Sequence, residues 1–139
     1  DIPVFQLSLD YTFNDWHPRP LGYHYDLAGQ LADLRSRGVL IIGSGNIVHN
    51  LGILDFESID AKPYDWAREF DEAVKAGLVA QDDKRLIGLG AKNPEAVPTP
   101  DHYLPMIYTI ALREKAEPLA FTYEGFQHAS ISMRCFQIG

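Results

Sequence analysis

The sequence predicts an α/β fold, in which a mostly parallel sheet with flanking helices ends in a C-terminal β-hairpin and forms part of a larger sheet. Three observations predict it. An apolar segment at 4–9, a helical pattern over 21–37 and an apolar run at 39–42 follow one another in the order of a βαβ unit. The run at 39–42 lacks polar alternation, which is typical of a central parallel strand. Residues 119–123 and 131–135 return to a period of two, which predicts an antiparallel hairpin.

Two parallel strands are predicted in the first part of the chain. Residues 4–9 are bounded by Pro3 and Asp10, which favours a short, largely buried strand. A right-handed crossover would connect it to the strand at 39–42. The chain begins without Met and already inside the first predicted strand, so we expect a fragment or a chain from which a preceding segment was removed. Half of a sheet would then be missing, and the exposed edge would invite association.

Two amphipathic helices are predicted in the first part of the chain. The first ends at Gly38, and Pro63 could open the second, in which Asp71 and Lys75 are placed for an i,i+4 ion pair. The apolar face of the first helix also carries a histidine, and that of the second an aromatic pair. The residues of the two stripes are Leu21, His24, Leu27, Leu31 and Leu34, and then Trp66, Phe70, Val74 and Leu78.

The next segments lead to a third helix. A short helical stretch over 82–89 and a Pro-rich loop over 93–100 precede an apolar pattern over 104–111. Proline is tolerated only in the first turn of a helix, so Pro105 marks the start of this one. His102 is therefore expected at or just before the helix start.

The composition is that of one globular domain covering residues 1–139. Apolar residues make up 46%, and 12 Lys and Arg against 19 Asp and Glu give a net charge of −7. Nucleic-acid binding needs a basic patch, so this acidic balance excludes a nucleic-acid partner. No apolar run approaches the roughly 20 residues that cross a bilayer, and no signal-type segment opens the chain. We therefore expect no membrane partner and a cytoplasmic protein.

His49 is the first candidate for chemistry. It follows the predicted strand at 39–42 through Gly43, Ser44, Gly45 and Asn46, whose two glycines and asparagine permit backbone angles that other residues avoid. Ligands of α/β proteins bind beyond the carboxyl ends of strands, and neutral imidazole is a common ligand of zinc or iron. The alternative is a histidine that hydrogen-bonds the loop, and the residues leave both readings open. The loop matches neither a Walker A motif nor a complete GxGxxG, which argues against a nucleotide site.

His102 is the second candidate. At a helix N-terminus the dipole keeps the imidazole neutral near pH 7, so that it can bind a metal or accept a proton. The alternative is that His102 only helps to cap the helix beside Asp101.

For the other candidates we favour structural roles. His24 shares the apolar face of its helix, His17 lies in the loop before that helix, and His128 opens the last strand after a turn predicted at 124–125. Cys135 is the one cysteine, which excludes an internal disulfide, and its place in a strand predicts an inert buried thiol.

Four blocks of the sequence resemble the C-terminal half of class III (LigB-type) extradiol ring-cleaving dioxygenases, in the branch of the 4,5-DOPA dioxygenase extradiol group. The resemblance is collinear over essentially all of the chain. The blocks are PVFQLSLD at 3–10, GSGNIVHNL at 43–51, PTPDHYLP at 98–105 and SISM at 130–133.

The resemblance implies a non-haem metal-dependent enzyme that cleaves the ring of a DOPA-like catechol with O₂, using Fe(II), which Zn²⁺ can replace in crystals. By position it implies that His49 is a metal ligand, and that His102 lies at the metal, where it ligates or shuttles the catechol proton. It does not identify the substrate-binding residues.

The resemblance also implies that this chain is incomplete as a catalyst. The family's N-terminal half carries a GHGSP-type block and a second His that complete the metal site, and no histidine of this chain coincides with them. Two His ligands are too few for a tight site, so the isolated chain should be inactive unless an N-terminal half or a partner chain supplies the others, with a homo-oligomer as one form of association. The alternative function is a non-catalytic protein-interaction module on the same fold.

Overall fold

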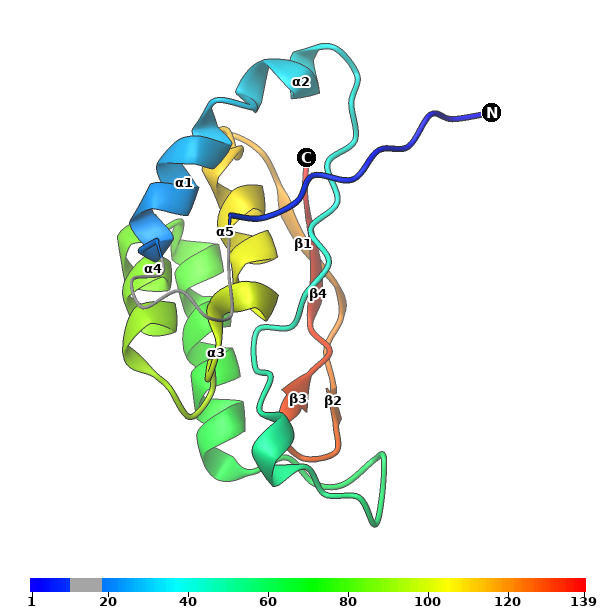
Figure 1. Ribbon diagram of the computed structural model, residues 1–139, viewed down its shortest axis with the longest axis vertical. Helices are drawn as coiled ribbons and strands as arrows, with labels where there is room; N and C mark the ends of the chain where they lie inside the picture. Colours follow the sequence, from blue (N-terminus) through cyan, green and yellow to red (C-terminus); the bar gives the residue numbers. More distant parts are fainter. Residues whose placement is uncertain (11–18) are drawn as a thin grey trace.

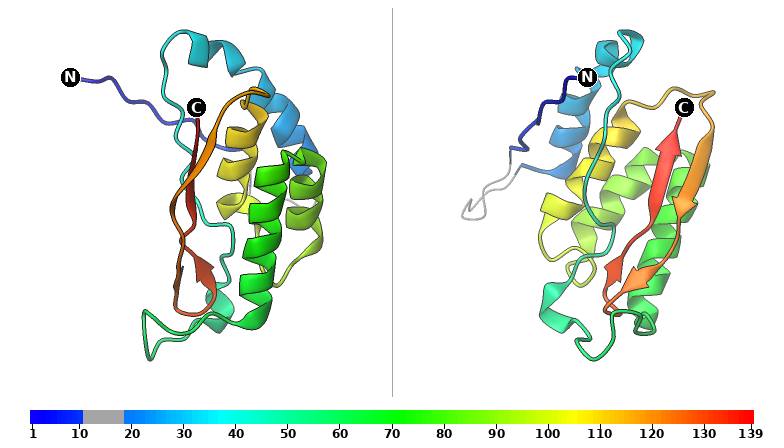
Figure 2. Two further views of the ribbon diagram at one scale, coloured as in Figure 1. Left: turned by 180° about the vertical axis from the view of Figure 1, so that it is seen from behind. Right: turned by 90° about the vertical axis from the view of Figure 1, so that its right-hand side faces the viewer.

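The computed structural model describes residues 1–10 and 19–139, which form two layers. Figures 1 and 2 show a layer of helices packed against a long hairpin, beside which the extended segment 39–47 runs. The helices are α1 (Leu21–Gly29), α2 (Ala32–Ser36), α3 (Asp65–Ala80), α4 (Asp83–Lys92) and α5 (Leu104–Ala111), with 3₁₀ turns η1 (Leu51–Ile53) and η2 (Pro100–His102). The strands are β1 (Leu119–Tyr123), β2 (Phe126–Gln127), β3 (Ile131–Ser132) and β4 (Cys135–Ile138).

The C-terminal hairpin is confirmed, but its turn is elsewhere than predicted. β1 pairs with β4 and β2 with β3, both antiparallel, and the register shifts between Phe121 and Tyr123. The chain continues through 124–125 and reverses at His128 and Ala129, which have φ angles of 50° and 62°. His128 therefore lies in the turn and does not open a strand. The register shift explains the error, because it interrupts the strand alternation next to residues 124–125, where the turn was predicted.

The predicted parallel sheet is not formed by the described residues, whose two small sheets are both antiparallel. Segments 4–9 and 39–42 are extended but belong to no strand, and Val4 and Leu40 are 91% and 81% exposed. Apolar runs become central strands only when neighbours pair with both edges and helices cover both faces. Within the described chain, no strand pairs with these two segments. The α/β prediction is thus confirmed in its helices and hairpin, and a parallel sheet is not shown by this part of the chain.

The first predicted helix is divided into two. α1 ends at Gly29, and α2 begins after Leu31, whose φ and ψ of −91° and 0° lie outside the helical range. Glycine has a low helix propensity, and its position in the middle of the predicted segment accounts for the break. Gly38 ends α2 with a φ of +78°, as the sequence predicted.

The core lies between α3, α4, α5 and the hairpin. In α3 the predicted stripe faces it, with Phe70, Val74 and Leu78 buried and Trp66 partly buried. From α5, Leu104, Ile107 and Ile110 pack into the same cluster. The predicted helices in these two regions are confirmed to within a few residues.

The predicted ion pair between Asp71 and Lys75 does not form. Asp71 is buried and pairs with Arg134 of the hairpin, whereas Lys75 contacts Glu124 at 2.7 Å. The hairpin therefore competes successfully for both side chains, because a bidentate guanidinium satisfies a buried carboxylate better than a lysine on the same helix face does. No helix in the ranges 1–10 and 19–139 is long and apolar enough to cross a membrane.

Candidate functional site

His49 is held in place by backbone contacts to two separate segments. Its N–H donates to the carbonyl of Ala96 at 3.0 Å, and it forms an isolated antiparallel bridge with Ile131 of β3. Next to it, Ser132 donates from its backbone to the carbonyl of Val48 at 3.0 Å. The segment around His49 thus extends the small sheet of the hairpin, and the Pro-rich loop covers it from the other side.

His102 is the last residue of η2 and lies two positions before the first residue of α5, at the helix start that the sequence predicted from Pro105. Tyr103 follows it and is fully buried, with its hydroxyl donating to the carbonyl of Leu86 at 2.8 Å. Burial raises the pKa of the Tyr103 phenol, so this hydroxyl keeps its proton and its hydrogen bond. The buried tyrosine anchors the start of α5 and leaves the preceding imidazole partly exposed.

The two glycines before His49 allow the loop to approach this helix start. A Cβ on Gly45 would overlap the carbonyl oxygen of His102, and one on Gly43 would lie 2.7 Å from that of Pro105. Neither glycine has a positive φ, and neither does Asn46. The sequence-based explanation by unusual backbone angles is therefore wrong. Glycine is required here because the backbones of two segments are in contact.

This contact brings the two predicted site histidines together. The rings of His49 and His102 are stacked, with their centroids 3.5 Å apart and their planes at 10° to each other. Positions 53 residues apart in the sequence (102 − 49) thus share one site. The loop beyond segment 39–42 and the start of α5 supply one imidazole each.

Asn46 and Asp101 complete the immediate surroundings of the pair. The Oδ1 of Asn46 lies 3.2 Å from the Nδ1 of His102, and its Nδ2 donates to the carbonyl of Ser132 at 2.9 Å. On the other edge of the ring, the Oδ2 of Asp101 lies 3.7 Å from the Nε2 of His102. The Oδ1 of Asp101 is buried and accepts no hydrogen bond from the residues in the described ranges.

Burial and charge keep one imidazole of the pair neutral. Desolvation lowers the pKa of His49, and the adjacent His102 lowers it further, against a smaller opposite effect of Asp101. No hydrogen bond joins the His49 ring to another residue of the described chain, so the alternative of a loop-bonding histidine has no support there. A neutral imidazole keeps a lone pair, which is what a metal ion or a proton requires.

The site fits part of a metal centre. It places two imidazole side chains, which are common ligands of zinc and iron, next to each other. Within 1–10 and 19–139, however, no group of three His, Cys, Asp or Glu is arranged to hold a metal ion. The described chain therefore offers two imidazoles, fewer than the three or four protein ligands of a stable site.

The other candidates from the sequence lie apart from this pair. His24 is buried and contacts the Tyr108 hydroxyl at 3.2 Å through its Nδ1, a satisfied core histidine as expected. His128 contacts the carbonyl of Asp55 at 2.9 Å through its Nδ1, which agrees with a structural role. His17 lies outside the described residues. Cys135 is exposed, so the prediction of a buried thiol is wrong: at β4 the strand turns this side chain away from the helices.

Three residues of the site were missed by reasoning from sequence. Asn46 was interpreted as a turn residue, Asp101 as a neighbour of a cap, and Ser132 only as part of an alternating strand. All three residues fall inside the blocks that carry the family resemblance. Their position in those blocks was the one signal that could have drawn attention to them.

Comparison with known proteins supports the resemblance at the level of sequence. No family model matches the chain. Over 144 residues the chain is 36% identical to 4,5-DOPA dioxygenase extradiol of Escherichia coli K12, and the alignment covers 100% of this chain and 51% of that protein. The protein of the same name from Beta vulgaris is 31% identical over 131 residues, covering 90% of this chain and 46% of its own length. The chain is a homologue of the 4,5-DOPA dioxygenase extradiol proteins.

The chain spans about half the length of the curated relatives it matches, consistent with the C-terminal half of a LigB-type enzyme. The relative from Portulaca grandiflora gives the same proportion, with 28% identity over 99% of this chain and 49% of that protein. Among solved structures, the crystal structure of the uncharacterized protein JW3007 from Escherichia coli K12 matches with a TM-score of 0.77 and 36% identity. That match covers 87% of this chain and 51% of the other, so the homologue shares the fold of part of a larger protein.

Proposed function

We propose that this chain contributes one half of the active site of a non-haem extradiol dioxygenase, in which His49 and His102 bind Fe(II). The reaction breaks the carbon–carbon bond beside the two hydroxyl groups of a DOPA-like catechol and places both oxygen atoms of O₂ in the ring-opened product. The observation that carries the proposal is the stacked pair of imidazoles, 3.5 Å apart, from the two blocks with the strongest family resemblance.

The residues of this chain would perform two tasks. His49, whose pKa is lowered by burial, offers a neutral imidazole lone pair near pH 7. His102, partly exposed beside it, is placed either to donate a second lone pair or to take up the proton that a catechol hydroxyl releases. When bound, Fe(II) supplies the Lewis acidity and the redox chemistry toward catechol and O₂, which no side chain provides. Zn²⁺ is the redox-inactive ion that the same imidazoles would accept.

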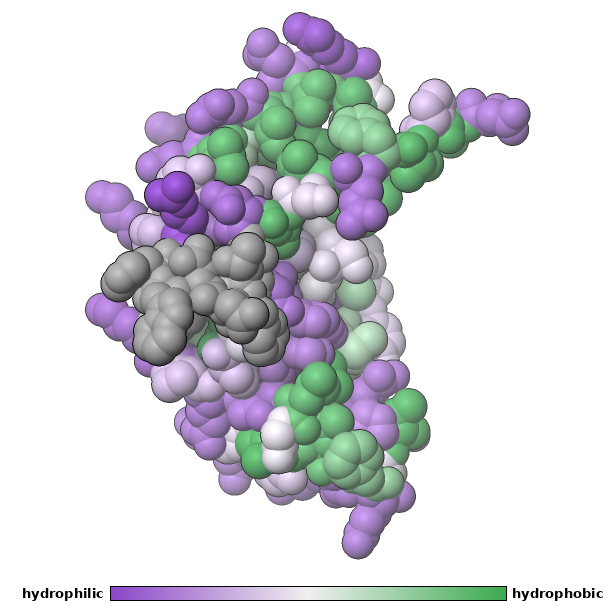
Figure 3. All heavy atoms as spheres, in the orientation of Figure 1, coloured by the Kyte–Doolittle hydropathy of each residue, from purple (hydrophilic) through white to green (hydrophobic). Residues whose placement is uncertain are grey.

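A complete site needs protein groups beyond those described. The relatives are about twice as long as the region they share with this chain, and we propose that the remaining ligands come from the corresponding half of the protein or from a partner chain. Apolar side chains exposed along segments 2–7 and 40–42 mark where that half would pack. Figure 3 shows apolar atoms gathered over the upper part of the molecule, where these segments lie.

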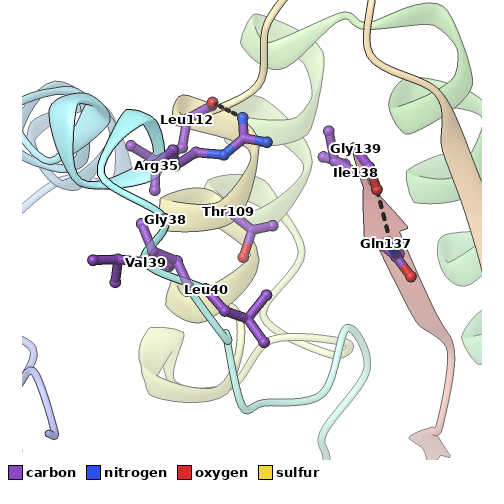
Figure 4. A pocket seen from close by; sticks show the side chains of 10 residues that line it. Arg35, Gly38, Val39, Leu40, Thr109, Leu112, Gln137, Ile138 and Gly139 are labelled. Atoms are coloured by element: carbon purple, nitrogen blue, oxygen red, sulfur yellow. Dashed lines mark hydrogen bonds between the residues drawn. The ribbon is translucent and has the colours of Figure 1, made fainter. Parts of the chain in front are cut away.

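A cavity next to segment 39–42 supports this docking region. It has a volume of about 350 Å³ and is lined by Gly38–Ile41, by Thr109 and Leu112 at the end of α5, and by Gln137–Gly139 at the end of the chain. Figure 4 shows that Leu40 and Thr109 lie on one side of this space and that the end of β4 lies on the other. Among the described residues β4 pairs only with β1, and Leu40 and Ile41 belong to no strand, so a further strand could pair at both borders.

The same exposed segments favour the second candidate, a non-catalytic interaction module. Leu40 and Ile42 are 81% and 78% exposed, and surfaces of this kind commonly bind other proteins. The two candidates differ in what the encoding gene contains. Upstream histidine motifs of the GHGSP type support the enzyme, and their absence from the gene supports the module.

The direct test is oxygen consumption by the full-length protein. It is reconstituted anaerobically with Fe(II), mixed with DOPA or another catechol, and followed with an oxygen electrode. We expect uptake of O₂ that depends on both Fe(II) and the catechol, and its loss in His49→Ala. His128→Gln is the matched control, because the ring of that histidine contacts the Asp55 carbonyl and Phe56, and its replacement should leave the rate near that of the wild type. Iron binding without O₂ uptake on any catechol would refute the dioxygenase function.

A further inference from the structure

Asn46 connects the imidazole of His102 to the hairpin, and the direction of its amide group is determined by its partners. Its Nδ2 lies 2.9 Å from the carbonyl oxygen of Ser132, which can only accept a hydrogen bond. That end of the amide must therefore be the NH₂ group. The opposite end, Oδ1, then faces the Nδ1 of His102 at 3.2 Å.

This direction settles where the neutral His102 ring carries its proton. The amide oxygen of Asn46 can only accept, so the Nδ1 of His102 must donate and hold the hydrogen. A neutral imidazole has one N–H, which leaves the Nε2 of His102 with its lone pair. Nε2 lies at the edge of the ring near Asp101, at 3.7 Å from its Oδ2.

The anchor of Asn46 is itself rigid. Ser132 is 1% exposed, its backbone N–H donates to Val48 at 3.0 Å, and its hydroxyl donates to Asp71 at 2.6 Å. The Asn46 side chain is thus held between a buried point of the hairpin and the start of α5. Its neighbour Gly45, in van der Waals contact with the His102 backbone, keeps the distance between the two segments short.

We propose that Asn46 is a positioning residue that fixes His102 in its Nδ1–H tautomer and thereby presents the Nε2 lone pair to the site. This inference rests on the proposed function for its significance, because Nε2 is then the nitrogen that would bind a metal or receive a proton. Hydrogen bonds of this kind to the second nitrogen of a ligand histidine are worth about 10- to 100-fold in metal affinity.

The tautomer can be measured without any metal. The full-length protein, labelled with ¹⁵N in its histidines, is studied by NMR at about pH 8, well above the ordinary His pKa of about 6.5. The ring nitrogens are distinguished by their shifts, since the protonated and the unprotonated nitrogen differ widely. In the wild type we expect His102 as the Nδ1–H tautomer. Asn46→Ala should shift it toward Nε2–H, whereas Asn46→Asp, which keeps an acceptor at this position, should retain Nδ1–H.

Asn50→Ala is the matched control. Asn50 is also an asparagine of this loop, but it donates to the carbonyl of Glu95 at 2.8 Å and accepts from the N–H of Gly52 at 3.0 Å, with no contact to His102. Its removal should leave the His102 tautomer unchanged. Binding of Zn²⁺ alone, measured by calorimetry, should weaken about 10- to 100-fold in Asn46→Ala and stay within about two-fold in Asn50→Ala.

The outcomes separate this inference from the proposed function. A wild-type His102 in the Nε2–H form, or a tautomer that Asn46→Ala does not alter, overturns the role of Asn46. If Asn46→Ala unfolds, the comparison of the wild type with Asn46→Asp still decides, because the loss of Nδ1–H in that variant contradicts the proposal. If the tautomer behaves as expected but the wild type binds no Zn²⁺ or Fe(II), the role of Asn46 in orienting the ring stands and the proposed dioxygenase site fails.

Discussion

Asp71 of α3 and Arg134 of the hairpin form a buried ion pair that joins the two layers of the molecule. Their side chains are each 3% exposed, and the Nε of Arg134 donates to both carboxylate oxygens of Asp71, at 3.1 and 3.0 Å. The hydroxyl of Ser132 donates to the same carboxylate at 2.6 Å. Because Ser132 also anchors Asn46, this pair supports the candidate site as well as the fold.

Removing one partner of this ion pair should lower the free energy of unfolding more than removing both partners does. Arg134→Met leaves a buried carboxylate without its counter-charge, and we expect a loss of roughly 3–5 kcal/mol in the free energy of unfolding. Adding Asp71→Asn to the same protein should recover part of that loss, since the uncompensated charge is gone. Urea denaturation of the two single variants and the double variant measures the coupling. As a control, Lys75→Met breaks the more exposed contact with Glu124 and should cost no more than about 1 kcal/mol. Additive effects of the substitutions at positions 71 and 134 would argue against the buried ion pair.

Phe70 and His49 should differ sharply in their effects on stability. Phe70 of α3 is buried, and its ring lies beside that of Tyr103. Phe70→Ala should therefore lower the free energy of unfolding by on the order of 3–5 kcal/mol through lost burial and the cavity that remains. His49→Ala removes a partly exposed ring that bonds no other side chain in the described ranges, and the free energy of unfolding should change by less than about 1 kcal/mol. Denaturant midpoints give both values. A large loss for His49→Ala would indicate that its role is structural.

Gly45 should tolerate no side chain at all. In Gly45→Ala the new Cβ would meet the carbonyl oxygen of His102, so the loop and the start of α5 must separate. We expect a lower melting temperature together with weaker Zn²⁺ binding. Gly88→Ala is the control, since nothing lies within 4 Å of a Cβ there and alanine favours the helix by about 0.5–1 kcal/mol. Equal behaviour of the two variants would contradict the close contact inferred for Gly45.

Stability should fall as the pH is lowered, partly because of His24. Burial lowers the pKa of His24 in the folded protein, against a smaller raising effect of Asp10, while the unfolded chain keeps the ordinary value of about 6.5. The unfolded state therefore binds more protons, and the contribution of neutral His24 is present above about pH 6.5 and lost as the pH falls below it. The unfolding free energy of the wild type should decrease from about pH 7.5 to 5.5.

His24→Gln provides the comparison for this pH effect. Glutamine can still reach the hydroxyl of Tyr108 but does not titrate, so the decrease should be smaller in the variant. In His24→Gln a smaller decrease of the unfolding free energy with falling pH should remain, because the pKa of His49 is also lowered. Identical pH slopes for the wild type and His24→Gln would show that His24 does not contribute.

Local patterns predicted much of the helical layer and the position of the site. The spacing of Phe70, Val74 and Leu78 indicated the buried face of α3, and Pro105 located the start of α5 and with it His102. These predictions succeeded because helix periodicity and proline geometry depend on neighbours within a few residues. The motif blocks at 43–51 and 98–105 likewise marked both histidines of the pair.

The strands and the contacts of the site depended on information that is not local. An apolar run such as 39–42 becomes a strand only if other strands pair with it, and the described residues hold no such strand. The role of Gly45 was misinterpreted for a related reason. The local sequence cannot distinguish a glycine that is required for a positive φ from one that is required for close contact between two backbones. Only the fold places the His102 backbone against it.

The sequence by itself predicted which residues would carry the chemistry: two histidines, each in a block that resembles extradiol dioxygenases. The tertiary structure decided that the rings of His49 and His102 stack at 3.5 Å and that Asn46 lies between the hairpin and the ring of His102. It also decided that Asp71 pairs with Arg134 and not with Lys75. The physical reason is distance along the chain. Periodicity records which face of an element is apolar, whereas contacts between residues such as 46, 102 and 132 arise only when packed layers bring distant backbones together.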